Sequence, residues 1–219
     1  MSAERGGHVP RHGPKGTRTR EALSEAALRL VLERGPAGFS VEDVTDAVGV
    51  SRRTFSRYFG SKEEAALDGF RADCARINDA LAARPASETP LTAYRAALRN
   101  WLADPVTPAW HRREGVREVL RLAETEAPLR AVLRRVLLEG EAVSVRLVAA
   151  RIGTDPEHDL RPAVAVGSGA ATLLAATRAW VIGGPREALP ALVEEAFALL
   201  ATEPPPVQAK EEKPERKAS

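Results

Sequence analysis

The stretch Gly49–Ala65, "GVSRRTFSRYFGSKEEA", decides how the whole chain is interpreted. It predicts a short helix that carries Arg52, Arg53 and Arg57, and no acidic residue lies between Ala47 and Ser61. Arg53 and Arg57 are one helical turn apart, and like charges at that spacing cost about 0.2–0.5 kcal/mol in an isolated helix. Folding alone does not require such a cluster, so we expect a negatively charged partner to complete it.

The same helix has an apolar side. On a helical wheel at about 100° per residue, Phe55, Tyr58 and Phe59 fall together, whereas Arg53 and Arg57 lie roughly opposite. We therefore expect the aromatic residues to dock onto the two preceding helices and the arginines to point outward. The alternatives are that the arginines form an ordinary solvated helix face and that Tyr58 serves only the core.

The flanking residues predict how this helix is joined to its neighbours. Ser40 caps a helix that ends at Gly49, and after a three-residue turn Ser51 caps the next one. Two short helices joined in this way are typical of a helix-turn-helix, whose second helix enters the major groove of DNA. Lys62 follows the cap Ser61, where the helix dipole disfavours a cation by about 0.3–1 kcal/mol. A phosphate bound at that helix start would reverse the sign.

The sequence "TREALSEAALRLVLERGPAGFSVEDVTDAVGVSRRTFSRYFGSKEEA" resembles the DNA-binding domain of TetR-family transcriptional regulators, over roughly residues 17–70. The resemblance implies a homodimer on double-stranded DNA, with one recognition helix in each of two successive major grooves of a palindromic operator. It implies that Thr54 and Tyr58 hold the DNA backbone, that Lys62 contacts a phosphate, and that base contacts come from the remaining polar residues of the helix. The predicted DNA-binding residues are Arg18, Ser40, Arg52, Arg53, Thr54, Ser56, Arg57, Tyr58 and Lys62.

The chain departs from the family pattern at Ser56, where many relatives carry an aromatic residue. The smaller, more polar side chain means that a relative's operator sequence does not transfer to this chain.

Composition limits the possible classes of protein. The 219 residues are 44% apolar, and they are rich in Ala, Leu, Arg and Glu, which favours an all-α fold. The net charge is +2, so a surface that binds an anion must be local. Cys74 is the single cysteine, which fits a reducing compartment. Because there is no signal peptide and the uncharged run Pro162–Thr177 is too short to span a bilayer, we expect a cytoplasmic protein that is nucleoid-associated when bound to its operator.

The expected organisation is a helix-turn-helix domain followed by a larger helical domain, with about nine helices in all. We expect a disordered basic arm at 1–16, the DNA-binding domain at 17–70 with the helix-turn-helix at about 40–59, a ligand-binding and dimerisation domain at 71–202, and a disordered tail at 203–219. The basic residues of the arm, and Arg18 and Arg20 after it, either enter the minor groove or serve solubility. One helix is expected from Ser61 to Pro85. The later helices are expected at Pro90–Leu102, Ala109–Ala123, Leu129–Arg151, Asp159–Ile182 and Pro185–Thr202.

The last two predicted helices are the candidates for the dimer interface. The first has a band of small residues that would let another helix approach closely, and the second has an apolar stripe too wide for one neighbour, which suggests a four-helix interface between two chains. The alternative is that both stripes are used inside the monomer. The predicted interface residues are Gly167, Ala170, Ala171, Leu174, Leu189, Leu192, Val193, Ala196, Phe197 and Leu200.

The larger domain is the candidate for ligand binding. We name Trp101, Trp110, Arg117 and Arg121 as ligand residues, although the tryptophans could be core and the arginines a solvated, salt-bridged face. Because the domain is rich in Ala, Leu and Val, an apolar or amphipathic small molecule is expected. The ligand would favour a spacing of the recognition helices other than the ~34–36 Å that matches one DNA turn.

The predicted function is therefore a sequence-specific transcriptional regulator, a homodimeric repressor that a small molecule releases. The alternative is an all-α adaptor whose basic helix meets an acidic protein. An enzyme is not expected, because the sequence has no Gly-rich phosphate loop, HExxH motif or nucleophile elbow. No cofactor is predicted, and no metal site, because His111, His158 and Asp155 lack further ligands nearby.

Overall fold

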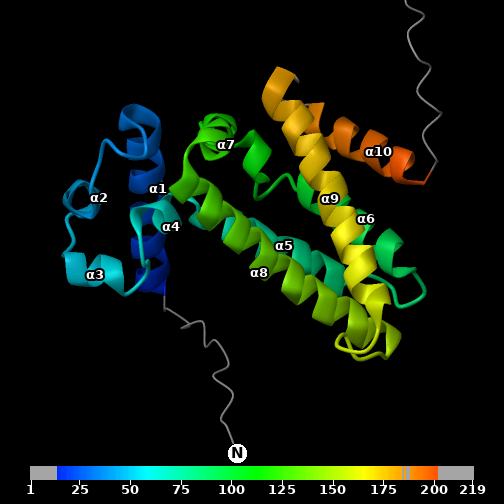
Figure 1. The fold of residues 1–219 in the computed structure, drawn as a ribbon. Helices are drawn as coiled ribbons and strands as arrows, with labels where there is room; N and C mark the ends of the chain where they lie inside the picture. Colours follow the sequence, from blue (N-terminus) through cyan, green and yellow to red (C-terminus); the bar gives the residue numbers. More distant parts are fainter. Residues whose placement is uncertain (1–13, 184, 186–187, 202–219) are drawn as a thin grey trace, which may run out of the picture.

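A computed structural model describes residues 14–183, 185 and 188–201, and these form an all-helical protein without a strand (Figure 1). The predicted fold class is thus confirmed. The elements are α1 (Pro14–Arg34), α2 (Val41–Val48), α3 (Arg52–Ser56), α4 (Lys62–Ala66), α5 (Asp68–Ala82), α6 (Pro90–Ala103), the 3₁₀ helix η1 (Trp110–Arg112), α7 (Val116–Thr125), α8 (Ala127–Ile152), α9 (Leu160–Gly183) and α10 (Leu189–Leu200).

The first helix starts earlier than expected. α1 begins at Pro14, so residues 14–16, which we assigned to a disordered arm, are helical. A proline fits the first turn of a helix because its missing N–H would have no partner there. The rest of the predicted arm and the predicted tail 203–219 lie outside the described residues.

Side-chain caps start α2 and α3 where the sequence predicted them. The Ser40 hydroxyl accepts a hydrogen bond from the Asp43 N–H at 3.1 Å, and the Asp43 carboxylate accepts one from the Ser40 N–H at 2.7 Å. Ser51 accepts from the Thr54 N–H at 3.2 Å. α2 ends at Gly49, whose φ of +71° is readily adopted only by glycine.

The helix expected from Ser61 to Pro85 is two helices. Leu67, with φ −100° and ψ 7°, lies between α4 and α5, and its carbonyl accepts from the Phe70 N–H at 3.0 Å. Leu67 is fully buried, and the Arg20 guanidinium of α1 binds the Asp68 carboxylate next to it through two hydrogen bonds of 2.8 and 2.5 Å. Arg20, which we had listed with the basic arm, instead fixes α1 to this junction.

The helix expected at Ala109–Ala123 is also interrupted. η1 is followed by Gly115 at φ +74°, and only then does α7 begin. A Cβ added to Gly115 would lie 2.2 Å from Cδ1 of Leu32, so the glycine lets this turn approach α1. The start of α7 thereby contacts α1, which belongs to the N-terminal unit that carries the helix-turn-helix.

In the larger unit the long helices pack against one another. α8 lies along α5, α9 packs on α6 and α8, and α10 packs on α9 (Figure 1). α9 has the length and composition of a membrane span. Its buried residues Val166, Ala176 and Trp180 belong to the common core, so the helix is used in packing within the chain.

A buried carboxylate joins three parts of this unit. Asp73 of α5 is only 2% exposed; it accepts a hydrogen bond from the Trp101 indole of α6 at 3.1 Å and is ion-paired with Arg76 and Arg113. Arg76 also donates to the Pro108 carbonyl at 3.3 Å. The cluster holds the segment that leads into η1 against α5.

Replacing this carboxylate should destabilise the protein. For Asp73→Ala we expect a loss of unfolding free energy on the order of 3 kcal/mol, because two guanidinium groups lose their buried partner. Urea unfolding measures it. Asp79→Ala, an exposed aspartate on the same helix, serves as the control and should change stability by less than about 0.5 kcal/mol. Equal effects of the two substitutions would contradict the role assigned to Asp73.

Candidate DNA-binding surface and ligand cavity

The recognition helix α3 is held by its aromatic side. Phe55 and Phe59 are buried, with ring centroids 5.7 Å apart, and the Tyr58 ring packs against Phe59 at 6.5 Å. This agrees with the predicted docking face. The opposite face of α3 is left to the solvent.

The two arginines that define the outward face are exposed. Within the described chain neither Arg53 nor Arg57 is paired with a carboxylate. The Arg57 guanidinium lies 4.8 Å from the centroid of the Tyr58 ring and donates to the Tyr58 hydroxyl at 2.8 Å. The surface therefore presents uncompensated positive charge next to the exposed Ser56.

Two of the predicted DNA contacts have partners inside the chain. Arg52 is paired with Glu42 of α2, although both side chains remain largely exposed, and such a pair contributes little. The Lys62 ammonium donates to the Phe39 carbonyl at 2.5 Å and lies 4.6 Å from the centroid of the Phe39 ring. The sequence does not show these contacts between different helices.

The remaining predicted contacts have local roles as well. Tyr58 is 9% exposed, so the alternative that it serves the core accounts for its ring. The Thr54 and Ser51 hydroxyls are 3.0 Å apart, and Ser40 closes its capping box. Arg18 is exposed on α1. Contact of these residues with DNA stays a prediction.

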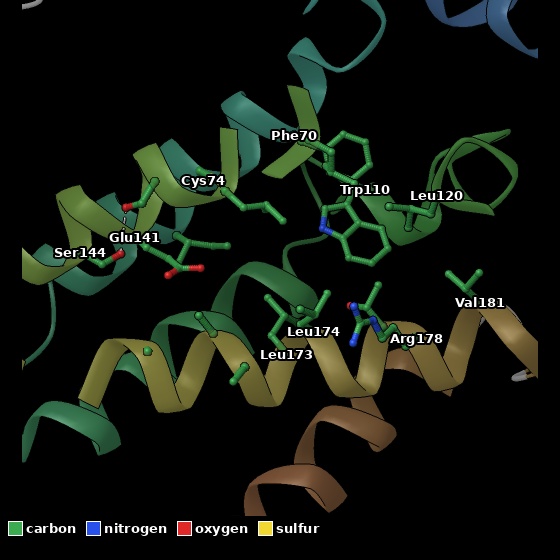
Figure 2. A pocket seen from close by; sticks show the side chains of 18 of the residues that line it. Phe70, Cys74, Trp110, Leu120, Glu141, Ser144, Leu173, Leu174, Arg178 and Val181 are labelled. Carbon is green, nitrogen blue, oxygen red and sulfur yellow. Dashed lines mark hydrogen bonds between the residues drawn. The ribbon is translucent and has the colours of Figure 1, made fainter. Parts of the chain in front are cut away.

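A cavity of about 510 Å³ opens between α5, α7, α8 and α9 (Figure 2). Its walls are mainly apolar, and a few polar side chains reach it. The apolar lining includes Phe70, Ile77, Trp110, Leu120, Leu133 and Leu174; the polar lining includes Asn78, Tyr94, Glu124, Glu141, Ser144 and Arg178. The volume lies in the range of pockets that hold drug-sized molecules.

Of the four predicted ligand residues, the cavity includes Trp110 alone. Trp101 is buried beside Asp73. The Arg117 guanidinium donates to the Trp180 carbonyl at 2.7 Å, and Arg121 donates to the Val181 carbonyl at 3.2 Å. Both arginines therefore bind carbonyls near the C-terminal end of α9, where cations are favoured. The two arginines thus have partners within the chain and lie outside the cavity lining, and their contact with a ligand stays a prediction.

The predicted dimer residues separate into four groups. Leu189, Val193 and Phe197 are buried in the monomer, so the alternative that the α10 stripe is used internally holds for them. Leu192 and Ala196 pack partly against the same core, while Leu200 is exposed. The α9 residues Gly167, Ala170, Ala171 and Leu174 line the cavity.

Sequence reasoning missed Glu141 and Cys74, which both line the cavity. A signal for Glu141 existed, because it interrupts an apolar row at helical spacing that runs through Leu133 and Leu137. Burial raises the pKa of the Cys74 thiol to about 11, so the thiol stays protonated near neutral pH. The signal for Cys74 was absent, since a lone cysteine marks no site.

A buried histidine lies next to Trp110, which forms part of the cavity wall. His111 is 1% exposed, its ring meets Trp110 edge-on at a centroid distance of 6.1 Å, and its buried Nδ1 lacks a hydrogen bond within the described chain. Burial, with a contribution from Arg112, lowers the pKa of His111 to about 4. The imidazole is therefore neutral at physiological pH.

Comparisons with known proteins agree with this geometry. Residues 23–66 match the family described as bacterial regulatory proteins, tetR family, and residues 88–205 match the MftR C-terminal domain. The HTH-type transcriptional regulator TcmR of Streptomyces glaucescens is 35% identical over 195 residues, covering 85% of this chain and 84% of that protein. The transcriptional repressor AcnR of Corynebacterium glutamicum is 33% identical over 138 residues, covering 62% of this chain and 67% of that protein.

A solved structure supports the fold. The fatty acid degradation regulator FadR from Bacillus halodurans superposes with a TM-score of 0.55 at 21% identity, covering 87% of this chain and 96% of that one. At this identity the likeness concerns the arrangement of the helices only.

The buried histidine should make stability depend on pH. The folded-state pKa of about 4 lies below the ~6.5 of an unfolded histidine, so the unfolded chain binds the proton first. The stability that neutral His111 contributes is complete above about pH 6.5 and is lost as the pH falls toward about 4. Urea unfolding of the parent and of His111→Gln should show the parent losing up to about 3 kcal/mol relative to the variant over that range. A difference that does not change with pH would contradict a neutral, buried His111.

Proposed function

Because the chain belongs to the TetR family of bacterial regulatory proteins, and is a DNA-binding transcriptional regulator rather than an enzyme, we propose that it acts as a homodimeric repressor on a palindromic operator. A small-molecule ligand would release it. The observation that carries the proposal is the pair of exposed, uncompensated arginines on a helix whose other face is buried. The adaptor alternative is not favoured, because the relatives named above are regulators. We place the protein in the cytoplasm, where its operator would be.

The proposed docking puts the N-terminal part of α3 in the major groove. Arg53 and Arg57 can each contact a guanine edge through two hydrogen bonds. Lys62 would exchange the neutral Phe39 carbonyl for a phosphate, because the negative charge of the phosphate adds a Coulomb attraction that the carbonyl does not offer. Arg52 would likewise leave its exposed pair with Glu42.

Ligand binding in the cavity would affect DNA binding through contacts between the two units. Arg135 of α8, the helix that carries part of the cavity wall, is paired with Glu64 of α4. Burial opposes ionisation of Glu64, but the Gly60 N–H and Arg135 outweigh it and lower the pKa of this carboxyl, so it is charged near neutral pH. A ligand that shifts α8 would move α4, whose N-terminus adjoins the recognition helix. Such coupling is typically about 1–3 kcal/mol.

The dimer interface is proposed on the exposed faces of α9 and α10. Ala175 and Ala179 lie one helical turn apart on α9, and both are exposed. On α10, Leu199 is 59% exposed and Ala191 is exposed as well. Small residues on one helix and an apolar residue on its neighbour suit close packing against a second copy.

The DNA-binding proposal is tested with variants on an operator selected from a random DNA pool. The selected sequences should contain an inverted repeat. Arg53→Ala should weaken binding by about 1–3 kcal/mol for each half-site, on the order of tenfold to a hundredfold per half-site, because each subunit of the dimer loses one base contact. Fluorescence anisotropy measures the affinity. Arg146→Ala, an exposed arginine of α8, is the control and should bind like the parent. If Arg53→Ala also bound like the parent, or no inverted repeat emerged, the proposal would be wrong.

The dimer proposal predicts that a long cation on α9 separates the subunits. For Ala175→Arg we expect a monomer, since the guanidinium would be buried without a partner in the interface. Sedimentation velocity distinguishes the two states. Ala142→Arg, the same change at an exposed position of α8, should remain dimeric. A dimeric Ala175→Arg protein would place the interface elsewhere.

A further inference from the structure

The Glu141 carboxylate lines the cavity and has no partner among the described residues of the chain. Glu141 is half-buried on α8, and Figure 2 shows its carboxylate directed into the space between α8 and α9. Within the part of the chain that the structure describes, it has neither a hydrogen bond nor an ion pair. Burial raises the pKa of Glu141, which is what an uncompensated acid in an apolar wall should show.

The polar groups around Glu141 are committed to one another. The Ser144 hydroxyl donates to the Asn78 side-chain oxygen at 2.6 Å, and the Asn78 amide nitrogen donates to the Gly140 carbonyl at 3.2 Å. Burial and the charge of Glu141 raise the pKa of Tyr94, so this phenol remains neutral. None of these groups supplies a positive charge to Glu141.

The cations of the region lie elsewhere. Arg71 is paired with Glu139 on the exposed side of α8. Tyr94, which is close enough to feel Glu141, fits against Gly169, where an added Cβ would be 2.4 Å from the Tyr94 ring. Arg178 is nine residues further along α9 than Gly169, which is roughly 13 Å at the helical rise. Arg178 therefore belongs to the other end of the cavity, as Figure 2 also shows.

One aromatic ring near this acid suits a positive charge. Tyr94 lines the cavity close enough to Glu141 for the two to interact electrostatically, whereas Phe70 and Trp110, with ring centroids 5.8 Å apart, lie toward the Arg178 end (Figure 2). Aromatic faces attract organic cations. An anion would be repelled by Glu141, and a neutral apolar molecule would desolvate the carboxylate without giving it a partner.

We propose that the cavity selects a lipophilic organic cation, with its positive centre beside Glu141 and its apolar body between α8 and α9. The inference rests on the proposed function only in treating this cavity as the ligand site. The charge of Glu141 and the aromatic lining carry it, together with a volume of about 510 Å³ that suits a drug-sized molecule.

The experiment compares two probes of the same shape and opposite charge, tetraphenylphosphonium and tetraphenylborate. Their binding is followed by tryptophan fluorescence, because Trp110 forms part of the cavity wall. The parent protein should bind the phosphonium at least about tenfold more tightly than the borate. Equal binding, or tighter binding of the borate, would overturn the proposal.

Variants assign the effect to one carboxylate. Glu141→Gln should lose on the order of tenfold in affinity for tetraphenylphosphonium while its affinity for tetraphenylborate rises. Glu139→Gln, on the outer face of α8, should bind the phosphonium like the parent, and Glu124→Gln, the other acidic residue of the lining, should lose less affinity than Glu141→Gln. A loss in Glu124→Gln with none in Glu141→Gln would refute the assignment. Because Glu141→Gln removes an unpaired charge, thermal unfolding should find it at least as stable as the parent, which separates a binding defect from misfolding.

The same probes distinguish a failure of this inference from a failure of the proposed function. If tetraphenylphosphonium binds in a Glu141-dependent way but operator affinity is unchanged, the cavity preference holds and the ligand-release mechanism fails. If a neutral molecule releases the operator and Glu141→Gln leaves phosphonium binding intact, the repressor function holds and the cation preference is wrong.

Discussion

The packing of the aromatic face of α3 against the N-terminal core is the interaction on which the rest depends. α3 is a single five-residue helix, too short to be stable alone, so Phe55 and Phe59 must be buried for it to exist. Once they are buried, the geometry of the helix directs Arg53 and Arg57 outward. The charged surface that we propose to contact DNA is thus a consequence of the hydrophobic contact on the opposite side of the helix.

One continuous hydrophobic core runs from the N-terminal helices into the larger unit, and specific contacts link the two units as well. Arg20 fixes α1 to the break between α4 and α5, Gly115 lets α7 reach α1, and Arg135 connects α8 to α4. The half-buried Glu141 carboxylate lines the cavity without a partner among the described residues, so its charge is poorly solvated. A positively charged ligand would compensate that charge and, in the proposed mechanism, would shift α8 relative to α4.

Most of the N-terminal unit was predictable because its signals are local. The caps at Ser40 and Ser51 and the stop at Gly49 act within three or four residues, and the structure places each as expected. The interruptions at Leu67 and Gly115 were not predictable, because each is set by a neighbour distant in sequence. Arg20 and Leu32 of α1 are those neighbours, and hydrophobic periodicity contains no information about them.

By itself the sequence determined the helical class, the family, and the outward-facing arginines, because periodicity, capping and charge are properties of short segments. Tertiary structure alone decided the partners of the long helices. Gly167 and Ala170 of α9 line a cavity, Val193 and Phe197 of α10 are buried within the chain, and Arg117 and Arg121 bind carbonyls near the end of α9. The physical reason is that an apolar stripe or a charged row specifies only that something must cover or neutralise it. Which element does so depends on how helices far apart in the chain come together.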